Sequence, residues 1–186
     1  NCWVCELPIS IELIGGENIV VKNCQLGAQP TGITCKVQEV NKLSFINNQV
    51  YPDGRENLVL DACDNCVIEG NNFKSYYNGI LVLNGNDNTV NKNIFWLTGA
   101  VQNQLLDHGD DFGIINVKGN NNMVASNSLS CEWAYAGAVT VNAVQGTGNV
   151  FKNCFVDNLE SYRVFLVNAQ TEVSNCVSSD KVSIVE

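Results

Sequence analysis

The residue types best suited to chemistry occur together in one short turn. It reads Tyr51-Pro-Asp53-Gly-Arg55-Glu56 and places an aromatic ring beside a guanidinium and two carboxylates. A tyrosine ring can stack on a sugar, and charged groups can bind sugar hydroxyls. The same letters also describe an ordinary Pro-Asp-Gly turn whose charges are merely solvated. The turn therefore predicts either a sugar-binding site that uses Tyr51 and Arg55 or a plain surface turn.

A second group of chemically useful residues lies in the segment from Trp96 to Phe112. It contains His108, which is the only histidine of the chain, and the acidic residues Asp107, Asp110 and Asp111. Loops that project from a rigid scaffold are frequent binding sites, so Asp110 and Asp111 are candidate substrate contacts. The alternative is a solvated loop or a subunit contact. No serine is placed to act as a nucleophile for His108, so the segment does not predict a catalytic triad.

The elements that position these residues follow from an internal repeat. The pattern is an apolar residue, two spacers, Asn or Cys, one spacer and a second apolar residue, and the last copy is shortened by one spacer before its Asn. Its copies are Val21/Cys24/Leu26, Phe45/Asn48/Val50, Ile68/Asn71/Phe73, Val90/Asn93/Phe95, Val124/Asn127/Leu129, Val150/Asn153/Phe155 and Val173/Asn175/Val177. A single repeat cannot bury its own apolar face, so the copies must stack on one another. The one long step, between Asn93 and Asn127, contains the segment from Trp96 to Phe112.

A second run with strand character precedes each copy. These runs are Ile9–Leu13, Ile33–Val37, Leu58–Leu60, Ile80–Leu83, Ile114–Val117, Val139–Val141 and Val164–Val167, and Val182–Val185 reads as a last strand. β-Branched residues and Gly/Asn clusters between the runs indicate short strands and turns, and no useful helical periodicity appears. The sequence therefore predicts an all-β, right-handed parallel β-helix of about seven coils, with short turns and one longer loop.

Stacked coils bring equivalent positions together at about the 4.8 Å strand spacing. The recurrent Asn can therefore hydrogen-bond to the next coil, and Asn also tolerates the backbone of a sharp turn. We interpret this column as scaffold. By the same logic Tyr76 and Tyr77, one coil beyond Tyr51 in an equivalent turn, extend its surface as candidate substrate contacts.

Composition limits the classes of partner. The chain has 186 residues, 45% of them hydrophobic and 16% charged, which suits one domain over residues 1–186 with a substantial core. A net charge of −9 disfavours nucleic acid and anionic membranes as partners. No run has the length of a membrane span, and an uncharged polar partner fits better.

Nine cysteines are many for this length. The pairs Cys2/Cys5 and Cys63/Cys66 have zinc-ligand spacing, but they fall about two coils apart, so core or turn positions are the preferred interpretation and no metal is assigned. Cys154 and Cys176 follow the Asn column in successive coils and are expected to stack. An odd count favours reduced thiols, although a cleaved signal would leave no trace, so the compartment stays open.

The first coil begins almost at once without a capping element. Because an uncovered β-helix end exposes strand edges and core, we expect further coils upstream or supplied by another chain.

Several turns together resemble the C-terminal half of the inulin fructotransferases, which release difructose anhydrides from inulin. The resemblance is colinear and covers nearly the whole chain. Its segments are Leu26–Thr34, Pro52–Arg55, Cys63–Cys66, Tyr76–Leu81 with Leu83–Gly85, and Asp110–Val117 with Asn120–Asn122. It implies a right-handed β-helix, a homotrimer with active sites between subunits, a secreted enzyme, a fructan substrate and no cofactor. The implied chemistry needs one carboxyl acid and one carboxylate base or nucleophile.

The sequence departs from this family at both catalytic positions. The family's Asp aligns with Thr31 and its Glu aligns at or near Asn41, and neither side chain replaces a carboxyl group. Glu39 is the nearest acid to position 41 and, on a strand, would share its face. Glu39 and Asp53 are therefore the candidate catalytic substitutes. Three hypotheses follow: a fructan-active enzyme, a glycan-binding relative without activity, and a structural β-helix of a fibre or coat.

Overall fold

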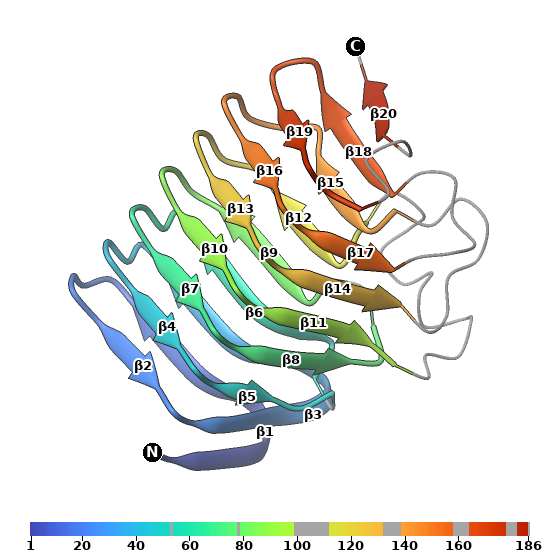
Figure 1. Cartoon of the computed structure of the whole chain (residues 1–186). Coiled ribbons are helices and arrows are strands. Elements are labelled where there is room, and N and C mark those ends of the chain that lie inside the picture. The colour runs from blue at the N-terminus through green and yellow to red at the C-terminus, as the bar shows by residue number, and fades with distance from the viewer. Residues whose placement is uncertain are drawn as a thin grey trace.

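The computed structural model describes residues 1–52, 54–77, 79–98, 112–131, 139–157, 164–177 and 182–185. Over these residues the chain forms a parallel β-solenoid, and its coils rise from the N-terminus at one end to the C-terminus at the other (Figure 1). No helix long and apolar enough to cross a membrane occurs in this part of the chain.

One wall of the solenoid is a sheet of seven parallel strands. Each strand comes from one copy of the sequence repeat, which agrees closely with the predicted number of coils. The strands are β2 (Val20–Lys22), β4 (Ser44–Ile46), β7 (Val67–Glu69), β10 (Thr89–Asn91), β13 (Met123–Ala125), β16 (Val150–Lys152) and β19 (Glu172–Ser174).

The other two walls belong to one sheet of thirteen strands. The long strands β1 (Trp3–Ile14) and β3 (Gln25–Gln38) run through both walls and join them. The first wall continues with β5 (Gln49–Val50), β8 (Asn72–Ser75), β11 (Ile94–Leu97), β14 (Ser128–Cys131) and β17 (Phe155–Asp157). The second continues with β6 (Glu56–Asp61), β9 (Leu81–Asn84), β12 (Ile115–Val117), β15 (Val141–Ala143), β18 (Phe165–Asn168) and β20 (Val182–Val185). The runs predicted from sequence fall in or beside these strands.

The core is a column of apolar side chains inside the coils. Phe73 lies between two further rings, with its centroid 6.1 Å from that of Phe45 and 5.0 Å from that of Phe95. All three rings are buried. Phe73 and Phe95 stack because they are register partners on the parallel strands β8 and β11, whereas Phe45 reaches the stack from β4 on the seven-stranded wall.

The predicted asparagine column is confirmed from Asn48 to Asn127. Asn71 shows the arrangement: its Oδ1 accepts from the Asn48 backbone N–H at 2.8 Å, and its Nδ2 donates to Phe45 O at 2.8 Å and to Asn93 Oδ1 at 2.9 Å. Each amide thus satisfies backbone groups of the coil before it. A second buried column, Asn88, Asn122 and Asn149, does the same at another corner and was not predicted.

The predicted register is wrong by one residue in the last two coils. Asn153 and Asn175 have left-handed backbone with φ of 53° and 51°, like Asn47 at 53°, which directly precedes the column residue of its own coil. The column itself continues through Cys154 and Cys176, whose predicted stacking is confirmed by a hydrogen bond from the Cys154 backbone N–H to Cys176 Sγ at 3.4 Å. Asparagine suits both positions, so sequence alone did not separate them.

The register change moves apolar side chains between core and surface. Phe151 and Val156 are buried, whereas Phe155, predicted to face inward, is 51% exposed. In the coil of Phe151 both residues of the pairs Val150/Phe151 and Phe155/Val156 are apolar, so hydrophobicity does not decide which residue of each pair faces the core.

Candidate binding groove and its corner

Four of the predicted substrate-binding residues meet at one corner of the solenoid. Tyr51 follows β5, Arg55 directly precedes β6, and Tyr76 and Tyr77 follow β8 in the next coil. Their side chains are partly or well exposed, with Tyr76 39% exposed. The structure therefore brings these residues onto adjacent turns, as the repeat predicts.

A buried amide holds the two turns of this corner together. The Asn57 side chain is fully buried, and its Nδ2 donates to Tyr51 O at 3.1 Å and to Lys74 O at 3.0 Å. The backbone that carries Tyr51 is thereby tied to the coil that carries Tyr76. Such fixed backbone favours binding because less motion is lost when a ligand arrives.

The same corner carries an acid with altered ionisation. Burial raises the pKa of Glu56, and the Arg55 guanidinium, 3.7 Å from its Oε1, opposes that shift only in part. The Glu56 side chain is 14% exposed. A carboxyl group that keeps its proton to higher pH is the type of group that serves as a general acid.

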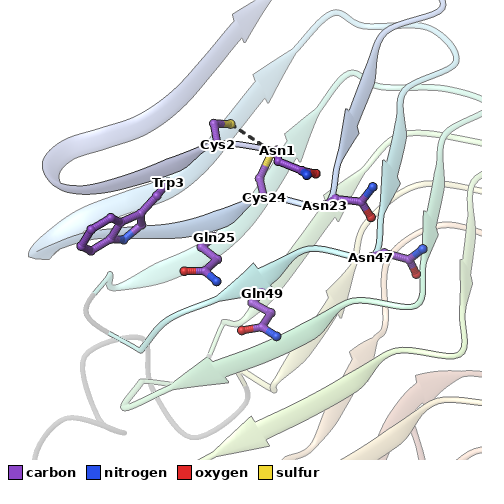
Figure 2. Close-up of a pocket in the computed structure, with 8 residues that line it drawn as sticks. All are labelled: Asn1, Cys2, Trp3, Asn23, Cys24, Gln25, Asn47 and Gln49. Atoms are coloured by element: carbon purple, nitrogen blue, oxygen red, sulfur yellow. Dashed lines mark hydrogen bonds between the residues drawn. The ribbon is translucent and has the colours of Figure 1, made fainter.

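A hollow beside this corner surrounds Trp3. Its volume is about 610 Å³, within the range of small-molecule sites. The lining residues are Asn1, Cys2, Trp3, Asn23, Cys24, Gln25, Asn47 and Gln49, and none of their side chains is charged (Figure 2). Trp3 is 74% exposed in this chain, and an exposed indole can stack on a ligand.

A second hollow of about 280 Å³ shares Trp3 and Gln25 with the first and adds Tyr51, Cys5 and Glu6. We call the two hollows together the Trp3 groove. Tyr51 links this groove to the corner of Arg55 and Glu56.

The polar lining of the groove is set by strand register. Trp3 pairs with Gln25 and Gln25 pairs with Gln49, so the three side chains leave successive strands at the same outward position. Figure 2 shows the indole beside the two glutamines. Each amide can both donate and accept hydrogen bonds. The sequence reasoning missed Trp3; marking the position after the repeat's column residue in every coil would have found it.

Glu39 lies at a different corner from the groove. Glu39 follows β3, is exposed, and has left-handed backbone with φ of 54°. Residues 39–41 therefore form a turn. The prediction that Glu39 and Asn41 share one face of a strand is wrong. By contrast, the backbone N–H of Arg55 donates to the carbonyl oxygen of Gly32, which precedes the run Ile33–Gln38 of β3, whereas Glu39 follows that run. The run Ile33–Gln38 between them spans roughly 17 Å.

The two positions that match the family's catalytic residues are separated in the same way. Thr31 is exposed beside the corner of Arg55, whereas Asn41 bonds to Glu17 and Asn65 at the far corner. A glycosidase carboxyl pair lies roughly 5 to 10 Å apart. Positions 31 and 41 of one chain therefore cannot form such a pair.

Asp53, Asp110 and Asp111, with His108, lie outside the described residues. Phe112 is described and packs against Gly79, where a Cβ would lie 2.5 Å from its ring. Gly79 has a φ of 83° as well, so this contact fixes the chain where it returns from the long segment.

The cysteines of the two C-x-x-C pairs lie apart. Cys63 and Cys66 are buried, and their thiols donate to backbone carbonyls of their own coil and the one before. Burial raises the pKa of both thiols, to about 11 for Cys66. No group of three or more His, Cys, Asp or Glu side chains gathers in the part of the chain described above. These thiols act as core and corner groups.

Comparison with known proteins agrees with this architecture. The family model described as "Right handed beta helix region" matches residues 31–184. The chain belongs to this family. Membership establishes the predicted handedness of the β-helix, which accords with the strong right-handed preference of parallel crossover connections. No curated protein sequence matches significantly.

Among solved β-helices, the chain is similar to DFA-IIIase from Arthrobacter chlorophenolicus A6. The structure of that protein without its lid gives a TM-score of 0.84 at 22% identity, with 99% of this chain and 48% of that chain covered. The lidless complex with GF2 gives 0.81 at 25% identity, covering 99% and 48%, and the C387A mutant with DFA-III gives 0.80 at 21%, covering 99% and 52%. The sequence resemblance is thus confirmed at the level of fold, and the chain spans about half the length of these relatives.

Proposed function

We propose that this β-helix binds a neutral, fructose-containing oligosaccharide in the Trp3 groove. The observation that carries the proposal is the exposed indole of Trp3 beside the outward amides of Gln25 and Gln49. An indole stacks on the apolar face of a sugar ring, and amides match hydroxyls that are themselves donors and acceptors. The lining is nearly uncharged, with Glu6 as its one charged side chain, which favours a neutral sugar over an anionic one.

The sugar class is supported by the structural relatives. DFA-IIIase structures with the same fold contain GF2 and DFA-III. The two hollows have volumes of about 610 and 280 Å³ and meet at Trp3, which gives room for more than one sugar ring. The protein therefore takes a short fructan or a difructose anhydride in preference to a single hexose.

The test is calorimetric titration with DFA-III, GF2 and cellotriose. Removing the indole in Trp3→Ala should weaken binding about tenfold or more, because the lost stacking and burial amount to roughly 1.5 to 3 kcal/mol. Phe155→Ala is the matched control, since Phe155 is exposed at the same outward position six strands along the sheet. Equal affinity of Trp3→Ala and the unmodified protein would refute the groove assignment.

A second candidate function is fructan cleavage by intramolecular fructosyl transfer, and the partly buried acid Glu56 favours it. A protonated Glu56 would donate its proton to the leaving glycosidic oxygen while a neighbouring fructose hydroxyl attacks the anomeric carbon. The second carboxylate, which would accept the proton of the attacking hydroxyl, would come from Asp53, or from another subunit if the chain forms the homotrimer that the family resemblance implies.

Turnover is tested by mass analysis of the products from inulin. The enzyme proposal expects release of a disaccharide lighter by one water than an ordinary hexose disaccharide, and loss of that release in Glu56→Gln with binding retained. Full turnover in Glu56→Gln would remove Glu56 from the reaction, and no release by the unmodified protein would leave binding as its role.

A further inference from the structure

The asparagine column is replaced by cysteines at both ends, and in both pairs the two thiols hydrogen-bond to each other. Trp3 pairs with Gln25, so Cys2 and Cys24 occupy the column position in the first two coils. Their sulfur atoms are 3.0 Å apart (Figure 2). Thiols this close on in-register strands already have the backbone separation that a disulfide requires.

At the other end the cysteines behave like the asparagines they replace. Cys176 Sγ accepts the Cys154 backbone N–H at 3.4 Å, as Asn71 Oδ1 accepts that of Asn48. Cys154 Sγ is directed towards the carbonyls of Val124 and Lys152. This pair continues the scaffold and is a natural comparison for Cys2 and Cys24.

Exposure distinguishes the first pair further. Cys2 is exposed and Cys24 is only 6% exposed, whereas Cys154 and Cys176 are both buried. In this chain Cys2 is the exposed member of the pair, and Cys24 lies within contact distance to complete the reaction.

We propose that Cys2 and Cys24 are a redox pair that forms a disulfide between the first two coils. With glutathione disulfide as oxidant, the Cys2 thiolate attacks one sulfur of the oxidant, whose S–S bond breaks to release one glutathione. Cys24 then loses its proton and attacks Cys2 Sγ, which releases the second glutathione. The two protein thiols lose two protons and two electrons, and the oxidant becomes two molecules of glutathione.

The link regulates the Trp3 groove, a consequence that rests on the proposed function. Both cysteines line the groove, and each directly precedes a ligand-binding residue, Trp3 or Gln25. A covalent tie between the coils fixes the start of β1, which carries the indole. Because Trp3 is then already held in place, less conformational entropy is lost when sugar binds. The oxidised form should therefore bind sugar about two- to tenfold more tightly.

The test treats the full chain with glutathione disulfide, blocks free thiols, digests it and identifies cross-linked peptides by mass. The expected product is a Cys2–Cys24 peptide with loss of two of the nine thiols. Cys24→Ser should stop at a glutathione adduct on Cys2, and the control Cys154→Ser should still form the link. A Cys2–Cys5 peptide as main product, or only the adduct in the unmodified chain, would overturn the pair.

Sugar titration of the oxidised and reduced forms separates the two proposals. Tighter binding after oxidation supports regulation, and equal affinity with the link formed overturns it. If the link forms and neither form binds sugar, the proposed function fails and the redox pair stands.

Discussion

Replacement of Asn71 by Ala tests the principal stabilising feature of the fold. Asn71 is 1% exposed, and its amide satisfies the Asn48 backbone N–H and the Phe45 carbonyl. In Asn71→Ala these two buried backbone groups lose their partner, while Asn93 Oδ1 keeps the N–H of residue 71 at 2.9 Å. Each unsatisfied group costs about 1 to 3 kcal/mol, so unfolding free energy should fall by roughly 2 to 6 kcal/mol.

Urea denaturation followed by far-ultraviolet circular dichroism measures this loss. The matched control is Asn120→Ala, since Asn120 belongs to an exposed column and accepts the Thr147 N–H at 2.9 Å where water can replace it. We expect the control to cost less than about 1 kcal/mol. Equal losses for Asn71→Ala and Asn120→Ala would refute the conclusion that burial gives the column its strength.

Three further predictions concern packing and ionisation. Phe73→Ala should cost about 3 to 5 kcal/mol in urea denaturation, because it empties a buried ring stack, and a loss under 1 kcal/mol would contradict that packing. Gly119→Ala should lower the melting temperature strongly, because its Cβ would overlap the Gly85 carbonyl of the coil before, and an unchanged melting temperature would disprove this close approach. Burial raises the pKa of Glu56 above 4.5, so folded protein binds its proton more tightly and loses stability as pH rises through the folded pKa. Glu56→Gln should lack that part of the decline above pH 4.5, and an identical dependence of the melting temperature on pH in the two proteins would contradict it.

The architecture was predictable because the repeat carries redundant information. Asn48, Asn71 and Asn93 each recur with an apolar residue three positions before and two positions after, and only stacked parallel coils bury all of these residues together. The predicted register is wrong by one residue at Asn153 because asparagine suits both the left-handed corner position and the hydrogen-bonding column position that follows it. Local sequence does not distinguish a side chain that satisfies the next coil from one that only permits a left-handed turn.

The candidate site was predictable only where its residues share one turn. Tyr51 and Arg55 were found from their own segment, and the coil repeat placed Tyr76 beside them. The sequence did not indicate a binding role for Trp3, because that role depends on the neighbouring Gln25 and on the hollow that both residues line. Both are set by strand register and by the stacking of coils. The raised pKa of Glu56 likewise follows from burial that a linear sequence does not display.

The most direct measurement of the central claim is a crystal structure of the protein with DFA-III or GF2 bound. The account predicts a sugar ring against the indole of Trp3, with hydroxyls within hydrogen-bond distance of Gln25 or Gln49. Ordered sugar on the second wall of the thirteen-stranded sheet, in the hollow of about 230 Å³ lined by Lys36, Asp61 and Lys118, would contradict it. An empty Trp3 groove in crystals grown at saturating sugar would contradict it equally.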